Sequence, residues 1–123
     1  MPSIAIIGAS ADKNKFGNKA VRVFADKGYK IYPIHPKAQE IEGHTAYTSI
    51  LKVPERQLDM VSLYLPPEVG LKVIADIAKV KPKEVWLNPG SESDELVEEA
   101  EKLGLAVILA CSIVGVGASP HKY

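Results

Sequence analysis

Five short apolar runs, joined by stretches with turn residues or helical spacing, limit the fold of this chain more than any other feature. They occupy residues 4–7, 30–34, 59–65, 84–87 and 105–110. The runs are largely apolar along their length instead of alternating with polar residues, which is typical of parallel strands with both faces covered. Because strand–helix–strand crossovers are right-handed, such strands form a parallel sheet with helices on both faces. We therefore predict a Rossmann-like, doubly wound α/β fold with five parallel strands in the order 3-2-1-4-5.

Glycine, proline and serine mark the boundaries of these elements. The first helix should end at Gly28, which adopts the left-handed cap conformation readily. Pro33 removes a donor from the second strand, which indicates a strand end or a sheet edge. Pro67 suits the first turn of the second helix, where its missing N–H costs nothing. Ser91 or Ser93 can cap the acidic third helix.

Length and composition indicate one globular domain, residues 1–123. Hydrophobic residues make up 46% of the chain and charged residues 24%, which is ordinary for a folded domain. No apolar run approaches the roughly 20 residues that span a bilayer, and the N-terminus does not resemble a signal peptide. The single cysteine, Cys111, excludes an internal disulfide, so we expect a reducing, cytoplasmic location. The three histidines lack ligand spacing with one another or with Cys111, so no metal site is expected.

Charge is balanced overall but unevenly distributed. The chain has 15 basic and 15 acidic residues, which does not favour nucleic acid as a partner. Residues 1–42 hold seven Lys or Arg against four acids, whereas residues 88–104 hold six acids against one Lys. The basic excess therefore lies in the part of the chain that contains the first glycine turn.

That turn, Gly8-Ala9-Ser10, follows the first apolar run and precedes a Lys-rich loop and Gly17. A strand, a glycine turn and a helix start in this order are how α/β proteins receive phosphate groups, because backbone can approach the ligand and the helix end favours an anion. The alternative is that Gly8 only makes a tight turn, since the full G-x-G-x-x-G spacing is missing.

The end of the second strand bears on which phosphorylated ligand is bound. A usual nicotinamide dinucleotide site has Asp or Glu there to hold the ribose 2′-hydroxyl. Here residues 32–37 contain no carboxylate and end in Lys37. A cation at this place suits an additional phosphate on the ribose, as in NADP or coenzyme A; the alternative is a solvated surface lysine.

Seven short motifs in order resemble those of the small stand-alone CoA-binding proteins. They are GAS at 8–10, KFGN at 15–18, GYKIYPIHP at 28–36, IEG at 41–43, YTSI at 47–50, YLPP at 64–67 and WLNPG at 86–90. These proteins are similar to the N-terminal CoA-binding domain of the succinyl-CoA synthetase α subunit and of NDP-forming acyl-CoA synthetases. The resemblance covers about residues 3–112, and the tail, residues 112–123, departs from the family pattern.

The resemblance implies that coenzyme A binds across the carboxyl edge of the sheet. Gly8, Ala9, Ser10 and Ala11 would approach the pantetheine and diphosphate, with Lys15 and Asn18 as phosphate or hydroxyl contacts. Lys37, in a loop shaped by Pro36, would lie beside the adenosine and its 3′-phosphate. Leu65, Pro66 and Pro67 would line an apolar wall, and Leu87, Asn88 and Pro89 would close the opposite side.

Three side chains near these loops have two interpretations each. Cys111 follows the fifth strand and could form a mixed disulfide with a bound thiol cofactor, or it is an inert residue at a strand end. Tyr32 and Tyr64 end adjacent strands and could stack on a base, or they pack in the core. No orienting carboxylate for a catalytic Cys–His pair is visible.

We therefore expect a domain that binds coenzyme A or an acyl-CoA without catalysing a reaction. Its partners would be the small-molecule ligand, with no nucleic acid and no membrane, and association with itself or another protein is left open. One alternative is an NADP-linked reductase that uses the same glycine turn and Lys37. The other is an interaction module with a vestigial pocket.

Overall fold

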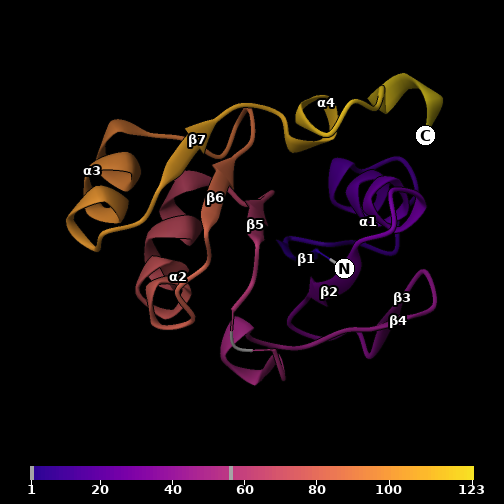
Figure 1. Ribbon diagram of the computed structural model, residues 1–123, viewed down its shortest axis with the longest axis horizontal. Helices are drawn as coiled ribbons and strands as arrows, with labels where there is room; N and C mark the ends of the chain where they lie inside the picture. Colours follow the sequence, from indigo (N-terminus) through magenta and orange to yellow (C-terminus); the bar gives the residue numbers. More distant parts are fainter. Residues whose placement is uncertain (1, 56) are drawn as a thin grey trace.

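The computed structural model describes residues 2–55 and 57–123. Its centre is a parallel five-stranded sheet, in the order β2-β1-β5-β6-β7 (Figure 1). The strands are β1 (Ser3–Ile7), β2 (Lys30–Ile34), β5 (Met60–Leu63), β6 (Glu84–Leu87) and β7 (Val107–Leu109). A separate antiparallel pair, β3 (Glu40–Ile41) and β4 (His44–Thr45), lies in the connection after β2.

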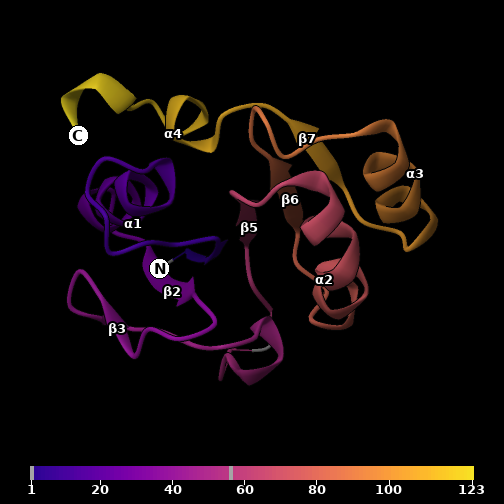
Figure 2. The same ribbon diagram turned by 180° about the vertical axis from the view of Figure 1, so that it is seen from behind.

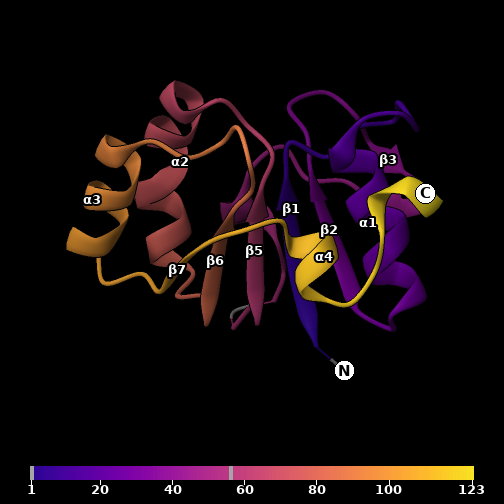
Figure 3. The same ribbon diagram turned by 90° about the horizontal axis from the view of Figure 1, so that it is seen from above.

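Helices cover both faces of the sheet, which confirms the predicted Rossmann-like α/β class. The helices α1 (Phe16–Asp26) and α4 (Ser112–Gly115) pack on one face, and α2 (Pro67–Lys79) and α3 (Asp94–Lys102) pack on the other. Figures 2 and 3 show this arrangement from behind and from above. Two short 3₁₀ turns, η1 (Ile50–Lys52) and η2 (Pro120–Lys122), complete the secondary structure. None of the helices in the described part of the chain has the length and apolar character that crossing a membrane requires.

The core is divided into two layers by the pleat of β1. Ile4 and Ile6 belong to the layer beneath α1, whereas Ala5 and Ile7 belong to the layer beneath α2 and α3. All four are buried, so a continuous apolar run is explained by two covered faces. Each fully buried isoleucine contributes about 2 kcal/mol relative to an exposed one.

The predicted strand order was wrong in the position of the third strand. That strand, β5, lies between β1 and β6 and not beyond β2. The reason is the face on which the connection from β2 crosses the sheet: its residues Ile50, Val53 and Leu58 are buried in the layer shared with α2 and α3, opposite α1. A right-handed crossover on the opposite face runs in the opposite direction along the sheet, so the chain returns past β1.

The two edge strands behave differently. Pro33 lies in β2, which is a sheet edge as the missing donor predicted. The last strand, β7, is shorter than the predicted run 105–110, and it departs from the expectation that both faces are covered. Leu109 is 58% exposed, because β7 ends the sheet and is only partly covered by α3.

Candidate functional site

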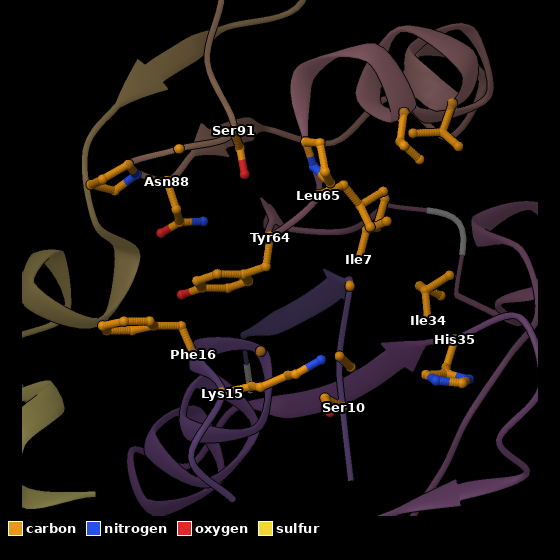
Figure 4. Close-up of a pocket in the computed structure, with 18 of the residues that line it drawn as sticks. Ile7, Ser10, Lys15, Phe16, Ile34, His35, Tyr64, Leu65, Asn88 and Ser91 are labelled. Carbon is orange, nitrogen blue, oxygen red and sulfur yellow. The ribbon is translucent and has the colours of Figure 1, made fainter. Parts of the chain in front are cut away.

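A cavity of about 920 Å³ opens at the carboxyl edge of the sheet. Figure 4 shows it between the loops that follow the strands and the start of α1. Nine of the residues predicted to bind the ligand line it: Gly8, Ala9, Ser10, Lys15, Pro36, Leu65, Pro66, Asn88 and Pro89. Thirteen further residues complete the lining: Ile7, Phe16, Gly17, Ile34, His35, Thr48, Tyr64, Val69, Val73, Gly90, Ser91, Cys111 and Pro120.

Five predicted contacts are not part of this lining: Ala11, Asn18, Lys37, Pro67 and Leu87. Leu87 is fully buried in the core, and Pro67 begins α2. Lys37 is exposed and directly follows Pro36 at the cavity wall. The backbone N–H of Lys37 donates to Nδ1 of His35 over 3.0 Å, so this loop is held by the histidine.

Two glycines bring the end of β1 against the start of α1. Gly8 has φ +91°, and a Cβ on it would lie 2.6 Å from the carbonyl oxygen of Tyr64. A Cβ on Gly17 would collide with the carbonyl oxygen of Gly8. Both positions therefore require glycine for packing, and Gly8 does form the tight turn that the alternative interpretation predicted. The same turn also forms part of the cavity wall.

Asn18 fixes this turn from behind. Its side chain is fully buried, and Nδ2 donates to the Ser10 carbonyl oxygen at 2.8 Å and to Glu42 Oε2 at 3.1 Å. Oδ1 accepts from Arg22 Nε at 2.7 Å. These bonds engage both ends of the amide, so Asn18 acts on the site by positioning the loop that carries Ser10.

The start of α1 gives the cavity a positive pole. Lys15 is the N-cap residue, has no side-chain cap and is followed by no acidic residue in the first turn. In the parts of the chain that the structure describes, the N–H groups of Phe16 and Gly17 have no protein acceptor. Figure 4 shows the Lys15 side chain extending across the cavity toward the loop of Ser10. Free N–H groups, a helix dipole and a lysine together favour a phosphate or another anion.

An apolar wall faces this pole. It is formed by Leu65 and Pro66 after β5 and by Val69 and Val73 on α2. Ile34 at the end of β2 extends it. A ligand with a charged end and a long apolar part could satisfy both sides of such a cavity.

A polar network closes the cavity at the ends of β5 and β6. Asn88 Nδ2 donates to Ser62 Oγ at 2.8 Å and to the Leu63 carbonyl oxygen at 2.7 Å. Ser62 Oγ lies 2.8 Å from Ser112 Oγ, which lies 3.0 Å from the Tyr64 hydroxyl. Burial raises the pKa of that hydroxyl to about 12. Tyr64 is therefore a neutral phenol at physiological pH, packed at the cavity wall.

The tail of the chain also borders the cavity, which the sequence did not indicate. Pro120 lines it, and its carbonyl oxygen accepts from Lys19 Nζ at 3.2 Å. The Tyr123 hydroxyl donates to Asp26 Oδ2 at 2.8 Å, which fastens the tail along α1. Earlier in the tail, a Cβ on Gly115 would lie 2.5 Å from the Trp86 ring, so this glycine permits the close approach of α4.

A cysteine and a histidine are among the residues that line the cavity. Cys111 lines the cavity and is partly exposed. His35 lines it at the β2 end, with Nδ1 committed to the backbone of Lys37 and Ala38. Within residues 2–55 and 57–123, no three His, Cys, Asp or Glu side chains are grouped as metal ligands would be.

The parallel sheet, the glycine turn after β1 and the cavity at the carboxyl edge place the protein in the class of Rossmann-like α/β domains. The sequence profile of the CoA binding domain family matches residues 2–117, so the chain belongs to that family.

Proteins similar to this chain include acetate–CoA ligases, ligase subunits and hypothetical proteins. The α subunit of the ADP-forming acetate–CoA ligase I from Pyrococcus furiosus is 32% identical over 98% of this chain and 29% of its own length. A conserved hypothetical protein from the same organism superposes with a TM-score of 0.84 at 32% identity, over 94% of this chain and 99% of that one. A dinucleotide-forming acetyl-coenzyme A synthetase from Candidatus Korarchaeum cryptofilum superposes with a TM-score of 0.75 at 30% identity, over 88% of this chain and 25% of that one.

Length separates this chain from the ligases. It spans between 11% and 29% of the length of the acetate–CoA ligases and ligase subunits that it matches.

Proposed function

We propose that the protein binds coenzyme A or an acyl-CoA in the cavity at the carboxyl edge of the sheet, and that it does so without catalysing a reaction. The observation that carries the proposal is a single cavity with a positive pole at Lys15 and the start of α1 and an apolar wall at Leu65, Pro66 and α2. Coenzyme A has the matching composition, with phosphates at one end and a long pantetheine arm. Membership of the CoA-binding domain family supports the same ligand.

The contacts follow the chemistry of the walls. We place the diphosphate at Lys15 and the free N–H groups of α1, where charge-assisted hydrogen bonds are strongest. The adenosine 3′-phosphate would lie at the mouth beside Pro36, within reach of the exposed Lys37. The pantetheine arm would cross the end of β1 between the apolar wall and the loop of Asn88 and Pro89, toward Cys111.

Isothermal titration with coenzyme A, dephospho-CoA and NADP tests this proposal. We expect coenzyme A to bind about tenfold more tightly than dephospho-CoA, because the latter lacks the 3′-phosphate. Lys37→Ala should reduce the difference in affinity between coenzyme A and dephospho-CoA. Lys15→Ala should weaken the binding of both ligands about tenfold. Lys27→Ala is the matched control, since Lys27 is an exposed lysine at the opposite end of α1.

The other outcomes are equally specific. Tighter binding of NADP than of coenzyme A would support the reductase-type alternative. Failure to bind any of the three would support an interaction module. Recovery of intact acetyl-CoA after prolonged incubation with the protein, measured by mass spectrometry, is the result expected of a binder without turnover.

A further inference from the structure

We propose that Tyr64 directs its hydroxyl proton into the cavity, as a hydrogen-bond donor for a carbonyl oxygen in the arm of the bound ligand. The inference deepens the proposed function, on which the identity of the ligand rests. It follows from the donors and acceptors in the series of hydrogen bonds that links the side chains of Asn88, Ser62, Ser112 and Tyr64.

The backbone fixes the first step. Asn88 Oδ1 accepts from the backbone N–H of Ser112 at 2.8 Å, so the opposite end of the amide carries the protons. That end, Nδ2, lies 2.8 Å from Ser62 Oγ, and an amide nitrogen can only donate. Ser62 Oγ is therefore an acceptor in this bond, and its own proton points elsewhere.

The next two steps follow from burial. Ser62 and Ser112 are both fully buried, so water does not take up their hydroxyl protons. Among the described residues, the acceptor available to the Ser62 proton is Ser112 Oγ, at 2.8 Å. That bond uses the Ser62 proton, so the Ser112 proton is directed to the Tyr64 oxygen, at 3.0 Å. Any other order would leave one buried hydroxyl without an acceptor, which costs about 1–3 kcal/mol.

Tyr64 is then the last member of the chain. Its oxygen accepts from Ser112, and its proton is left without an acceptor inside the network. Unlike the two serines, Tyr64 is only partly buried and lines the cavity. Figure 4 shows its ring across the cavity, with Asn88 above the hydroxyl and Phe16 below it. A chain of hydrogen bonds that all run in one direction also strengthens its terminal donor.

The absence of charge on this donor indicates which group of the ligand it binds. A neutral phenol provides one directed proton and no net charge, whereas the anion-binding features lie at Lys15 and the start of α1. Cys111 and Pro89 line the cavity with Tyr64, and they follow β7 and β6, on the other side of β1 from the strand β2 that precedes Lys37. A carbonyl oxygen is the acceptor that a single neutral donor satisfies, and the ligand offers one in each pantetheine amide and one in an acyl thioester.

Tyr64→Phe removes this hydroxyl while keeping the ring. We expect coenzyme A and acetyl-CoA to bind about three- to tenfold more weakly to the variant by isothermal titration. Adenosine 3′,5′-bisphosphate, which lacks the pantetheine arm, should bind equally well to both proteins. Tyr29→Phe is the control, because Tyr29 packs on Phe24 and does not line the cavity. Thermal melts of both variants establish that they are folded.

The pattern of losses identifies the acceptor. Equal losses for coenzyme A and acetyl-CoA assign it to a pantetheine amide, and a loss confined to acetyl-CoA assigns it to the thioester. Unchanged binding of both ligands would overturn the inference, and so would an equal loss for the bisphosphate.

A second measurement needs no ligand. Neutron diffraction from deuterated crystals of the free protein should place the Tyr64 deuteron on the cavity side, with deuterons on the lines from Ser62 to Ser112 and from Ser112 to Tyr64. A deuteron on Tyr64 directed at Ser112 would overturn the inference. Absence of coenzyme A binding by the unaltered protein would instead contradict the proposed function, and the neutron map would still decide the direction of the chain.

Discussion

The distance between the end of β1 and the start of α1 is set by two glycines in contact. Gly17 presents its Cα to the carbonyl oxygen of Gly8, and Gly8 is packed on the backbone of Tyr64. Three backbone segments thus approach one another where a Cβ on Gly8 or on Gly17 would separate them. The lysine and the free N–H groups of α1 are held next to the β1 turn by this contact, so the packing of two residues determines where these groups lie.

Gly17→Ala should therefore destabilise the protein more than an ordinary glycine substitution. The new methyl group meets backbone, which cannot move aside as a flexible side chain can. We expect the free energy of unfolding to fall by about 2–4 kcal/mol, measured by urea denaturation.

Gly43→Ala is the matched control for this substitution. Gly43 has φ +80° and open space around its Cβ position, so alanine there incurs only the conformational cost of about 1 kcal/mol. Equal losses of stability in the two variants would show that the contact between Gly17 and Gly8 imposes no steric requirement.

At the scale of elements, one carboxylate joins the starting ends of three strands. Asp59 Oδ2 accepts from the backbone N–H of Ser3 at 2.8 Å, and Ser3 Oγ accepts from the backbone N–H of Asp59 at 3.2 Å. Asp59 Oδ1 lies 3.1 Å from Lys83 Nζ, in the residues that precede β6. The hydrogen bond from the Ser3 backbone, with help from Lys83, lowers the pKa of Asp59 below its usual value.

Asp59→Asn should consequently lower stability near neutral pH and not in strong acid. A carboxylate with a lowered pKa in the folded state stabilises the protein above its unfolded pKa of about 3.9, and the contribution is lost as pH falls through the lower, folded value. Asp59 is partly exposed, so screening limits the effect to about 1 kcal/mol at pH 7.

Denaturation curves of both proteins between pH 7 and pH 2 measure this difference. The two curves should begin to converge below about pH 4 and meet once the pH lies below the folded pKa of Asp59. Asp76→Asn provides the comparison, because among the described residues the ion-pair partner of Asp76 is Lys79, one helical turn away on the partly exposed face of α2. A difference between the proteins that stayed constant down to pH 2 would mean that the charge of Asp59 is not what stabilises these strand ends.

At the scale of the whole molecule, local patterns predicted the elements and tertiary contacts decided their arrangement. The helix after Pro67, the serine cap at Ser93 and the left-handed Gly28 follow from short stretches of sequence, and each is present as predicted. The strand order depends on which face the segment containing Ile50 packs against, which no local pattern records.

The residues of the site also fall into those that local sequence predicted and those that tertiary contacts placed. Glycine and proline loops after parallel strands meet at one edge because the topology brings them there, so nine of the predicted contacts line the cavity. Asn18 was predicted as a ligand contact, but it lies in the first turn of α1 with its side chain buried, and its amide is hydrogen-bonded to Ser10 and Glu42. Pro120 reaches the cavity through long-range bonds of the tail to α1, a contact with no signal in the sequence.

The single cysteine reports whether a ligand occupies the full length of the cavity. Cys111 follows β7 and precedes Ser112, whose backbone N–H bonds to Asn88, whereas the proposed adenosine contacts Pro36 and Lys37 follow β2, on the other side of β1. An adenosine group bound at the mouth leaves the thiol open, and an arm extended toward β6 covers it. We expect saturating acetyl-CoA to slow alkylation of Cys111 by iodoacetamide about tenfold, measured by mass spectrometry of the intact protein.

Acetyl-CoA is the appropriate protecting ligand because its sulfur is acylated and does not consume the reagent. Adenosine 3′,5′-bisphosphate at saturation should leave the rate unchanged, which separates coverage by the arm from a general tightening of the protein. Cys111→Ser shows the background, since the chain has no other thiol. An unprotected thiol under conditions where titration shows full binding would place the arm outside this end of the cavity, and would also remove the basis for a mixed disulfide between Cys111 and coenzyme A.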